Sequence, residues 1–247
     1  MNYFLDTTET IPSSVGFSVF GVLHLGWILF FLVTVIANCI LYKKLGEVGR
    51  DRWRKIVASL IVLDEIYKVV MLIIGGRYEL SYLPLHLCSI NIFLIAFHAW
   101  KPTKTIGVFL YTVCIPGALA ALLFPSWTSL PLKNFMHLHS FTVHILLALY
   151  PITLALSGEL ELSIKDVPKC LLLLVGMAIP IYVVNLLLDT NFMFLMSVEE
   201  GNPLFIFEQL WGNHLLGYPV IIAGVVLVMY TPVLLLGFIN QKKNPPV

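Results

Sequence analysis

Long apolar runs, each close to the length that crosses a bilayer, dominate the pattern along this chain. A bilayer-spanning helix needs roughly 20 mostly apolar residues. Seven stretches meet this requirement and predict transmembrane helices over about 19–42, 56–74, 83–100, 106–123, 137–156, 169–188 and 215–239. The alternating ten-residue strands of a membrane barrel are not seen. The pattern therefore predicts an all-α, polytopic membrane protein that forms a single domain over residues 1–247.

The positions of Lys and Arg predict how these helices are oriented. Twelve of the 15 cationic residues fall in the first, third and fifth loops and at the C-terminus. Arg77 and Lys133 fall in the opposite loops, and Lys68 lies inside a span. Because cytoplasmic loops are enriched in Lys and Arg, the N-terminus is expected outside and the C-terminus in the cytoplasm.

Composition agrees with a membrane protein. The chain is 59% hydrophobic and 12% charged, with a mean hydropathy of +0.91, whereas soluble domains are roughly 45–50% apolar and about 25% charged. The net charge of +1 and the lack of a basic run with interleaved aromatics indicate membrane lipids, and no nucleic acid, as partners. All four cysteines lie in apolar segments, which favours single buried thiols over a disulfide framework.

Polar side chains of the predicted spans gather in their outer halves, although such groups are costly in a bilayer. The clearest are His24, Glu65, Lys68, His86, Cys88, Asn91, His137, His144, Asn185 and Asp189. The inner halves are nearly free of them, apart from His98. We therefore predict a polar pocket in the outer leaflet half.

Helical spacing refines this pocket. At about 100° per residue, His137 and His144 share a helix face and His139 points roughly 200° away from His137. Asp64 and Glu65 lie four and three residues before Lys68, so one carboxylate can neutralise the lysine. The other carboxylate is expected to pair with His86 or His144.

Several local patterns together resemble a known family. They are the stretch 83–88, with its Pro-Leu-His-Leu-Cys ending, His24 before it, His144 followed by Tyr150-Pro151, and Asn185 followed by the stretch 190–195. In order and spacing these resemble the bacterial YwaF-like integral membrane proteins, which implies a multispan helical fold in the bacterial plasma membrane.

A more distant resemblance, carried by the Pro-Leu-His and His-to-Pro patterns, is to the eukaryotic transmembrane protein 164 acyltransferases, which remodel ether phospholipids. This resemblance implies that His144 takes the place of the catalytic histidine. In those relatives a cysteine directly precedes the histidine of the third span, whereas this chain has Leu85 there and carries Cys88 two residues beyond His86.

The leading hypothesis is a phospholipid acyltransferase or lipid hydrolase with a histidine base. His144, His86, Cys88 and Glu65 are the predicted catalytic residues. His144 would activate Cys88, Ser89, Ser140, a water or a lysolipid hydroxyl, and Glu65 or Asp189 would orient it. The predicted substrate-binding residues are His24, Asn91, Asn185, Asp189 and Asn191, the asparagines serving as oxyanion donors.

Three alternatives remain open at this point. A proton-coupled transporter would use Glu65, Lys68 and the histidines as a relay, although no inverted repeat is seen. A seven-helix sensor would bind an amphipathic ligand in the same pocket. No cofactor is expected for the leading hypothesis, but His24, His86 and His144 on three helices at one depth would also suit a catalytic zinc.

Overall fold

The computed structural model describes residues 3–200 and 202–243, and this part of the chain contains helices and no strand. Six helical segments are long and apolar enough to cross a membrane. They are Val22–Lys43, Leu80–Trp100, Lys104–Leu123, Phe135–Leu156, Ile164–Leu188 and His214–Leu235. The prediction of an all-α protein with several membrane-spanning helices is confirmed.

The described chain divides into two compact units, one within residues 1–160 and one within 161–247. The single domain over 1–247 stays a prediction. The first unit contains α1 (Val22–Lys43), α2 (Glu47–Ile74), α3 (Leu87–Trp100), α4 (Lys104–Phe109), the π-helical turn η3 (Leu110–Cys114), α5 (Ile115–Leu123) and α6 (Phe135–Leu156), with the 3-10 turns η1 (Ser13–Val15) and η2 (Leu80–Tyr82).

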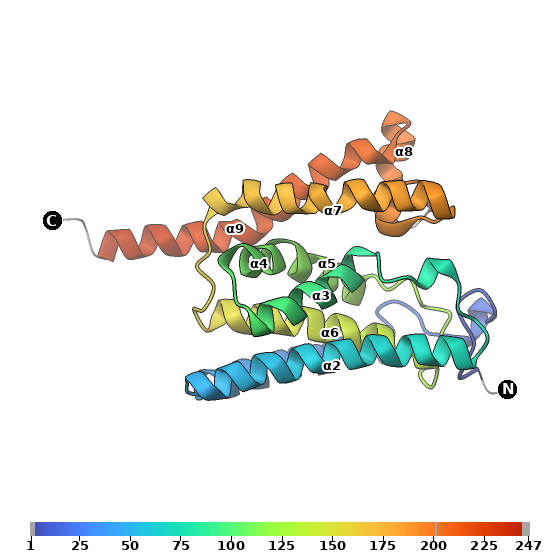
Figure 1. Cartoon of the computed structure of the whole chain (residues 1–247), viewed down its shortest axis with the longest axis horizontal. Helices are drawn as coiled ribbons and strands as arrows, with labels where there is room; N and C mark the ends of the chain where they lie inside the picture. Colours follow the sequence, from blue (N-terminus) through green and yellow to red (C-terminus); the bar gives the residue numbers. More distant parts are fainter. Residues whose placement is uncertain (1–2, 201, 244–247) are drawn as a thin grey trace. The chain divides into compact units, whose positions relative to one another are not determined.

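Helix α6 forms the centre of the first unit. It packs against α1, α2, α3 and α5, of which the last three are labelled in Figure 1. In its most apolar 18-residue stretch 67% of the residues are buried, against 11% in that of α1. The helix begins where the Asn134 side chain accepts hydrogen bonds from the N–H groups of Met136 and His137, at 2.9 and 3.2 Å. Asparagine favours this capping position because its side chain satisfies N–H groups that have no partner inside the helix.

Two prolines mark changes in helix geometry. Pro84 lies in a turn, so α3 begins at Leu87 and not near residue 83 as the sequence predicts. His86 is the N-cap residue of α3. The π-helical turn η3 ends just before Pro116, whose ring nitrogen donates no hydrogen bond. It joins α4 and α5 into one continuous helical segment, Lys104–Leu123.

Helix α2 is the segment on which the number of spans depends. It is 28 residues long and packs against α3 and α6, but it is not one of the six candidate spans. Its apolar part contains Asp64, Glu65 and Lys68. The seventh span and the orientation of the termini therefore stay predictions.

The second unit contains α7 (Val167–Leu188), α8 (Phe205–Trp211) and α9 (Gly217–Lys243), with the 3-10 turns η4 (Ile164–Asp166), η5 (Phe192–Phe194) and η6 (His214–Leu216). Helix α8 is a short helix in the long segment between α7 and α9. Beyond it, the Glu208 carboxylate accepts the backbone N–H of His214 at 2.7 Å and contacts its Nδ1 at 3.0 Å. These bonds hold the pKa of Glu208 below its usual range.

Candidate functional site

His24 lies at the start of α1 and is completely buried. Its Nδ1 accepts the backbone N–H of Phe20 at 2.8 Å, and its Nε2 lies 2.7 Å from the carbonyl oxygen of Leu122. A carbonyl oxygen only accepts, so Nε2 carries the proton and both ring nitrogens are occupied within the protein. In this structure His24 ties α1 to the end of α5.

A cluster of ionisable side chains joins α2 to α6. Lys68 donates to Glu65 at 2.5 Å, and both residues are 7% exposed. On α6, His139 lies 3.1 Å from a carboxylate oxygen of Asp64 through Nδ1 and 3.8 Å from Glu65 through Nε2. Thr142, three residues after His139, also donates to Asp64, at 3.2 Å.

The prediction that Glu65 or Asp64 neutralises Lys68 is confirmed by the Glu65 pair. The prediction that the remaining carboxylate pairs with His86 or His144 is wrong, because Asp64 faces His139. The sequence alone does not show which face of α6 packs on α2. The available signal was the spacing of His139 and Thr142, which places both on one face of the helix.

His144 differs from the other histidines of α6 in what its ring contacts. Its Nδ1 lies 2.6 Å from the carbonyl oxygen of Ser140, one turn earlier, and its ring stacks on Trp127 at 5.4 Å. Because a carbonyl oxygen only accepts, Nδ1 of His144 carries the proton, and the lone pair of the neutral ring lies on Nε2. No described residue forms a hydrogen bond to that nitrogen, and His144 is half-buried.

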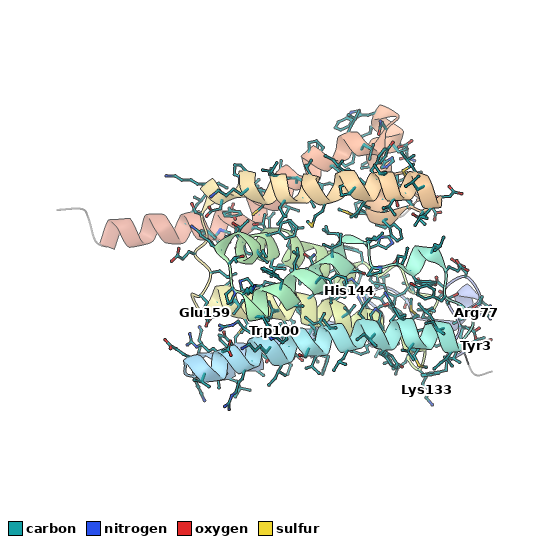
Figure 2. The ribbon with its side chains drawn as sticks, in the orientation of Figure 1. Tyr3, Arg77, Trp100, Lys133, His144 and Glu159 are labelled. Carbon is teal, nitrogen blue, oxygen red and sulfur yellow. The ribbon has the colours of Figure 1, made fainter. Side chains whose placement is uncertain are left out.

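His144 lies between the end of the first unit that carries Glu159 and the end that carries Arg77 and Lys133 (Figure 2). The Asp64 and His139 side chains are close enough to act electrostatically on His144. The charge of Lys68 acts in the same way on His86 at the start of α3. Three of the four predicted catalytic residues, Glu65, His86 and His144, therefore belong to one polar region shared by α2, α3 and α6.

Helix α3 contributes Cys88 and Asn91 to this unit. Cys88 is a free, half-buried thiol that packs against the apolar core. Asn91 is 3% exposed, and its Oδ1 is buried with no hydrogen-bond partner among the described residues. A buried polar atom without a partner is uncommon in proteins. A bound molecule or a water would satisfy it.

The remaining predicted residues belong to the second unit. Asn185 is buried and stabilises the turn that follows α7, because its side chain donates one hydrogen bond to the backbone of Phe192 and accepts another from it. Asn191 bonds the backbone of Met196 and Ser197. Asp189 is exposed and ends α7 in the left-handed conformation, with φ 51°. Each of the two asparagines has a structural role in its own loop.

The histidines proposed as alternative zinc ligands do not fit a metal in this arrangement. His24 has no ring nitrogen left for coordination. Within residues 3–200 and 202–243, no three His, Cys, Asp or Glu side chains form a group that could hold a metal ion.

Sequence reasoning missed two residues of the region, His139 and Trp127. Trp127 is 8% exposed, stacks on His144 and keeps a buried Nε1 that donates to no described residue. It lies in a loop between α5 and α6, where an aromatic residue carries no periodic signal. His137 instead has both ring nitrogens occupied, by Leu130 and Trp27, and is part of the packing.

Several apolar helices expose large side chains, such as Val22 at 92% and Leu187 at 76%, and charged groups are buried between helices. These features define an integral membrane protein of the multispan helical class. Residues 19–230 match the TMEM164 family. This match covers most of the chain, which therefore belongs to that family, as the more distant resemblance in the sequence suggested. No curated protein and no solved structure matches the chain.

Proposed function

We propose that this membrane protein is a phospholipid acyltransferase or lipid hydrolase in which His144 is the general base. The observation that carries the proposal is the hydrogen bond of Nδ1 to Ser140. It fixes the tautomer in which Nε2 holds a lone pair, and a base needs that lone pair within reach of the proton it removes. Membership of the TMEM164 family supports acyl chemistry.

In the proposed step, Nε2 of His144 takes the proton of an attacking hydroxyl, from water or from a lysolipid, as its oxygen bonds to the ester carbonyl carbon. The ester bond then breaks, and the imidazolium returns the proton to the departing alkoxide. A protein nucleophile, Cys88, Ser89 or Ser140, would divide the same transfer into two steps. The Ser140 carbonyl orients the base in place of the predicted Glu65 or Asp189 carboxylate.

The neighbouring polar groups have supporting roles in this proposal. The buried Oδ1 of Asn91 has no partner among the described residues and would accept a hydrogen bond from the attacking hydroxyl, whereas its Nδ2 is the atom that would donate to the oxyanion. Glu65 and Lys68 neutralise each other, and Asp64 lies beside His139, so the cluster keeps charged groups beside the base without a large net charge. Stacking on Trp127 would favour the imidazolium that forms during the reaction.

The proposal includes the topology and location. Helix α2 crosses the membrane as a seventh span, because its three internal charges are each beside an oppositely charged or ionisable partner. The N-terminus lies outside, the C-terminus lies in the cytoplasm, and the protein resides in the bacterial plasma membrane.

The test is lipid mass spectrometry on the purified protein with a mixture of phospholipids and lysophospholipids. Wild type is expected to release or redistribute acyl chains, and His144→Asn to lose about 10²–10⁴-fold in rate, the usual contribution of a general base. Asparagine can still donate to Ser140, so the fold is kept. His98→Asn, at a histidine that bonds Tyr150, is the matched control and keeps its activity.

Activity of His144→Asn within a few-fold of wild type would show that another group is the base. If wild type leaves the lipids unchanged, the enzyme proposal fails. The linked ionisable groups Asp64, His139, Glu65 and Lys68 favour a proton-coupled transporter as the second candidate. Proton flux into liposomes, compared between wild type and Glu65→Gln, tests that candidate.

A further inference from the structure

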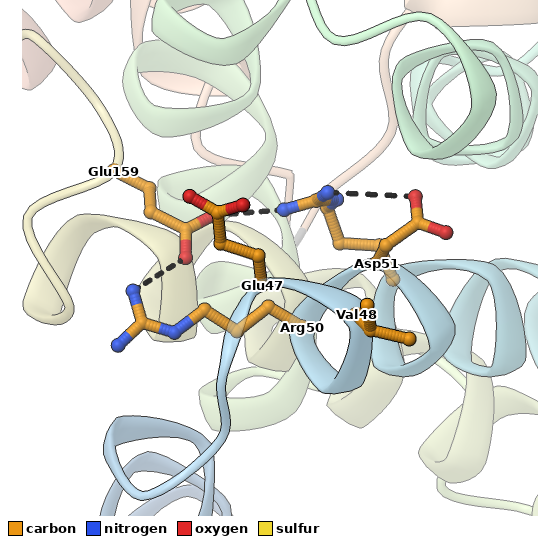
Figure 3. Close-up of a pocket in the computed structure, with 6 residues that line it drawn as sticks. Glu47, Val48, Arg50, Asp51 and Glu159 are labelled. Atoms are coloured by element: carbon orange, nitrogen blue, oxygen red, sulfur yellow. Dashed lines mark hydrogen bonds and ion pairs between the residues drawn. The ribbon is translucent and has the colours of Figure 1, made fainter.

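An open cavity of about 590 Å³ lies beside the first turns of α2, at the opposite end of that helix from Arg77. Its lining residues are Glu47, Val48, Arg50, Asp51, Arg54 and Glu159. Five of the six are charged, and Figure 3 shows the charged ends of Glu47, Arg50 and Glu159 gathered beside these turns. None of them belongs to the proposed catalytic region.

The cavity is held in shape by a network around Glu159. One carboxylate oxygen of Glu159 accepts from Arg50 at 3.1 Å, and the other accepts from Arg54 at 3.0 Å. The hydroxyl of Tyr42, a fully buried residue, also donates to Glu159 at 3.0 Å, and the Arg50 guanidinium lies 5.3 Å from the Tyr42 ring centre. Both arginines are therefore positioned before any ligand arrives.

The network leaves both a hydrogen-bond donor and a negatively charged acceptor of the lining unused. Arg54 is used within the network, since its Nη1 contacts Glu159 and its Nη2 lies 3.5 Å from Asp51, and its Nε is buried without a partner among the described residues. Arg50 uses Nη1 and Nε, toward Glu159 and the Leu45 carbonyl, and its Nη2 bonds no described residue. The Glu47 carboxylate forms no hydrogen bond or ion pair with the described residues, whereas Asp51 is paired with Lys55, whose hydrogen bond lowers the pKa of Asp51.

These charges define the kind of ligand. Two arginines face three carboxylates, so the lining carries one excess negative charge and does not favour a bare anion. A ligand with a phosphate and an ammonium matches both the open guanidinium edge and the unpaired carboxylate. Charge-assisted hydrogen bonds of this kind are the stronger ones in proteins, and guanidinium groups fit phosphate geometry well.

The position of the cavity indicates where such a ligand comes from. Helix α1 ends at Lys43, and Glu159 follows the end of α6 at Leu156; both helices are candidate membrane spans. The cavity is thus at the level where an apolar span gives way to charged residues, which is the level of lipid headgroups. In Figure 2, Glu159 lies well apart from His144.

We infer that this cavity binds the headgroup of a zwitterionic phospholipid with a primary ammonium, its phosphate against the open Nη2 edge of Arg50 and its ammonium against Glu47. The site is independent of the proposed catalytic chemistry. It would hold a lipid at the predicted cytoplasmic surface.

Native mass spectrometry of the full chain with added phosphatidylethanolamine, phosphatidylglycerol or phosphatidylcholine tests the inference. Wild type is expected to retain phosphatidylethanolamine best. Glu47→Gln should weaken that retention more than about tenfold and remove the preference over phosphatidylglycerol, since it removes a charge-assisted hydrogen bond to the ammonium. Arg50→Gln should weaken retention of all three lipids. Arg52→Gln and Glu79→Gln, at exposed residues outside the cavity, are the matched controls and should behave as wild type.

Unchanged retention of phosphatidylethanolamine in Glu47→Gln would overturn the inference, as would stronger retention of phosphatidylglycerol than of phosphatidylethanolamine by wild type. Glu47 has no side-chain partner among the described residues, so its substitution is not expected to affect folding, and the test stands even if Arg50→Gln unfolds. Soluble glycerophosphoethanolamine at the same concentration should displace the lipid only weakly. Full displacement would point to a soluble ligand and contradict the membrane-lipid assignment.

Discussion

Histidine chemistry in this protein depends on which ring nitrogen holds the proton, and backbone carbonyl groups decide it. Leu122 fixes His24, Leu130 fixes His137 and Ser140 fixes His144. In the first two rings the second nitrogen accepts an N–H of the protein, from Phe20 or Trp27. In His144 the second nitrogen accepts no N–H from the part of the chain that the structure describes. This difference separates a histidine that holds helices together from one that can remove a proton.

We expect His24→Phe to lower the free energy of unfolding by about 2–4 kcal/mol, because it leaves the buried Leu122 carbonyl and the partly buried Phe20 N–H without their partner. Thermal unfolding in detergent measures the change. His24→Gln, which can keep one donor and one acceptor, should lose less. Equal stability of His24→Phe and wild type would show that these two bonds contribute nothing.

At the scale of the element, α2 illustrates how a helix keeps charged residues among apolar ones. The spacing of Glu65 and Lys68 predicts their ion pair from the sequence, because residues three apart share a helix face. The partner of Asp64 depends on the face that α6 presents, and that face is set by packing against four other helices. Local pairs are therefore predictable here, and pairs between helices are not.

Lys68→Met should destabilise the protein by about 3–5 kcal/mol, since it leaves the Glu65 carboxylate buried without its cation. The double variant Glu65→Gln/Lys68→Met removes both charges and should recover most of that stability. Chemical unfolding of the single and double variants measures this. A double variant that is no more stable than Lys68→Met would contradict the pairing.

At the scale of the whole molecule, the distribution of cations and the charges of α2 decide the topology together. If α2 crosses the bilayer, the loops before and after it lie on opposite sides. Reporter fusions that end at Arg52 and at Arg77 are expected to report cytoplasmic and external positions, respectively. Cytoplasmic signals at both sites would show that α2 does not cross, and the six candidate spans would then be the full set in the described part of the chain.

The sequence by itself determined the class of protein and the approximate limits of its apolar helices. Length and hydropathy suffice for this, because a bilayer demands about 20 apolar residues whatever the helix packs against. It also predicts that His24, Glu65, His86, His144 and Asp189 lie at a similar depth. Of these, Glu65, His86 and His144 belong to the polar region of α2, α3 and α6.

Only the tertiary structure decided what each polar group contacts. His24, Asn185 and Asn191 bind backbone groups of their surroundings, Asp64 faces His139, and His144 keeps one nitrogen open. At the charged cavity, Arg50 and Arg54 of α2 bond Glu159, which lies more than 100 positions away in the sequence. Hydrogen bonds depend on distances of a few tenths of an ångström and on ring orientation, and helical periodicity specifies neither between helices.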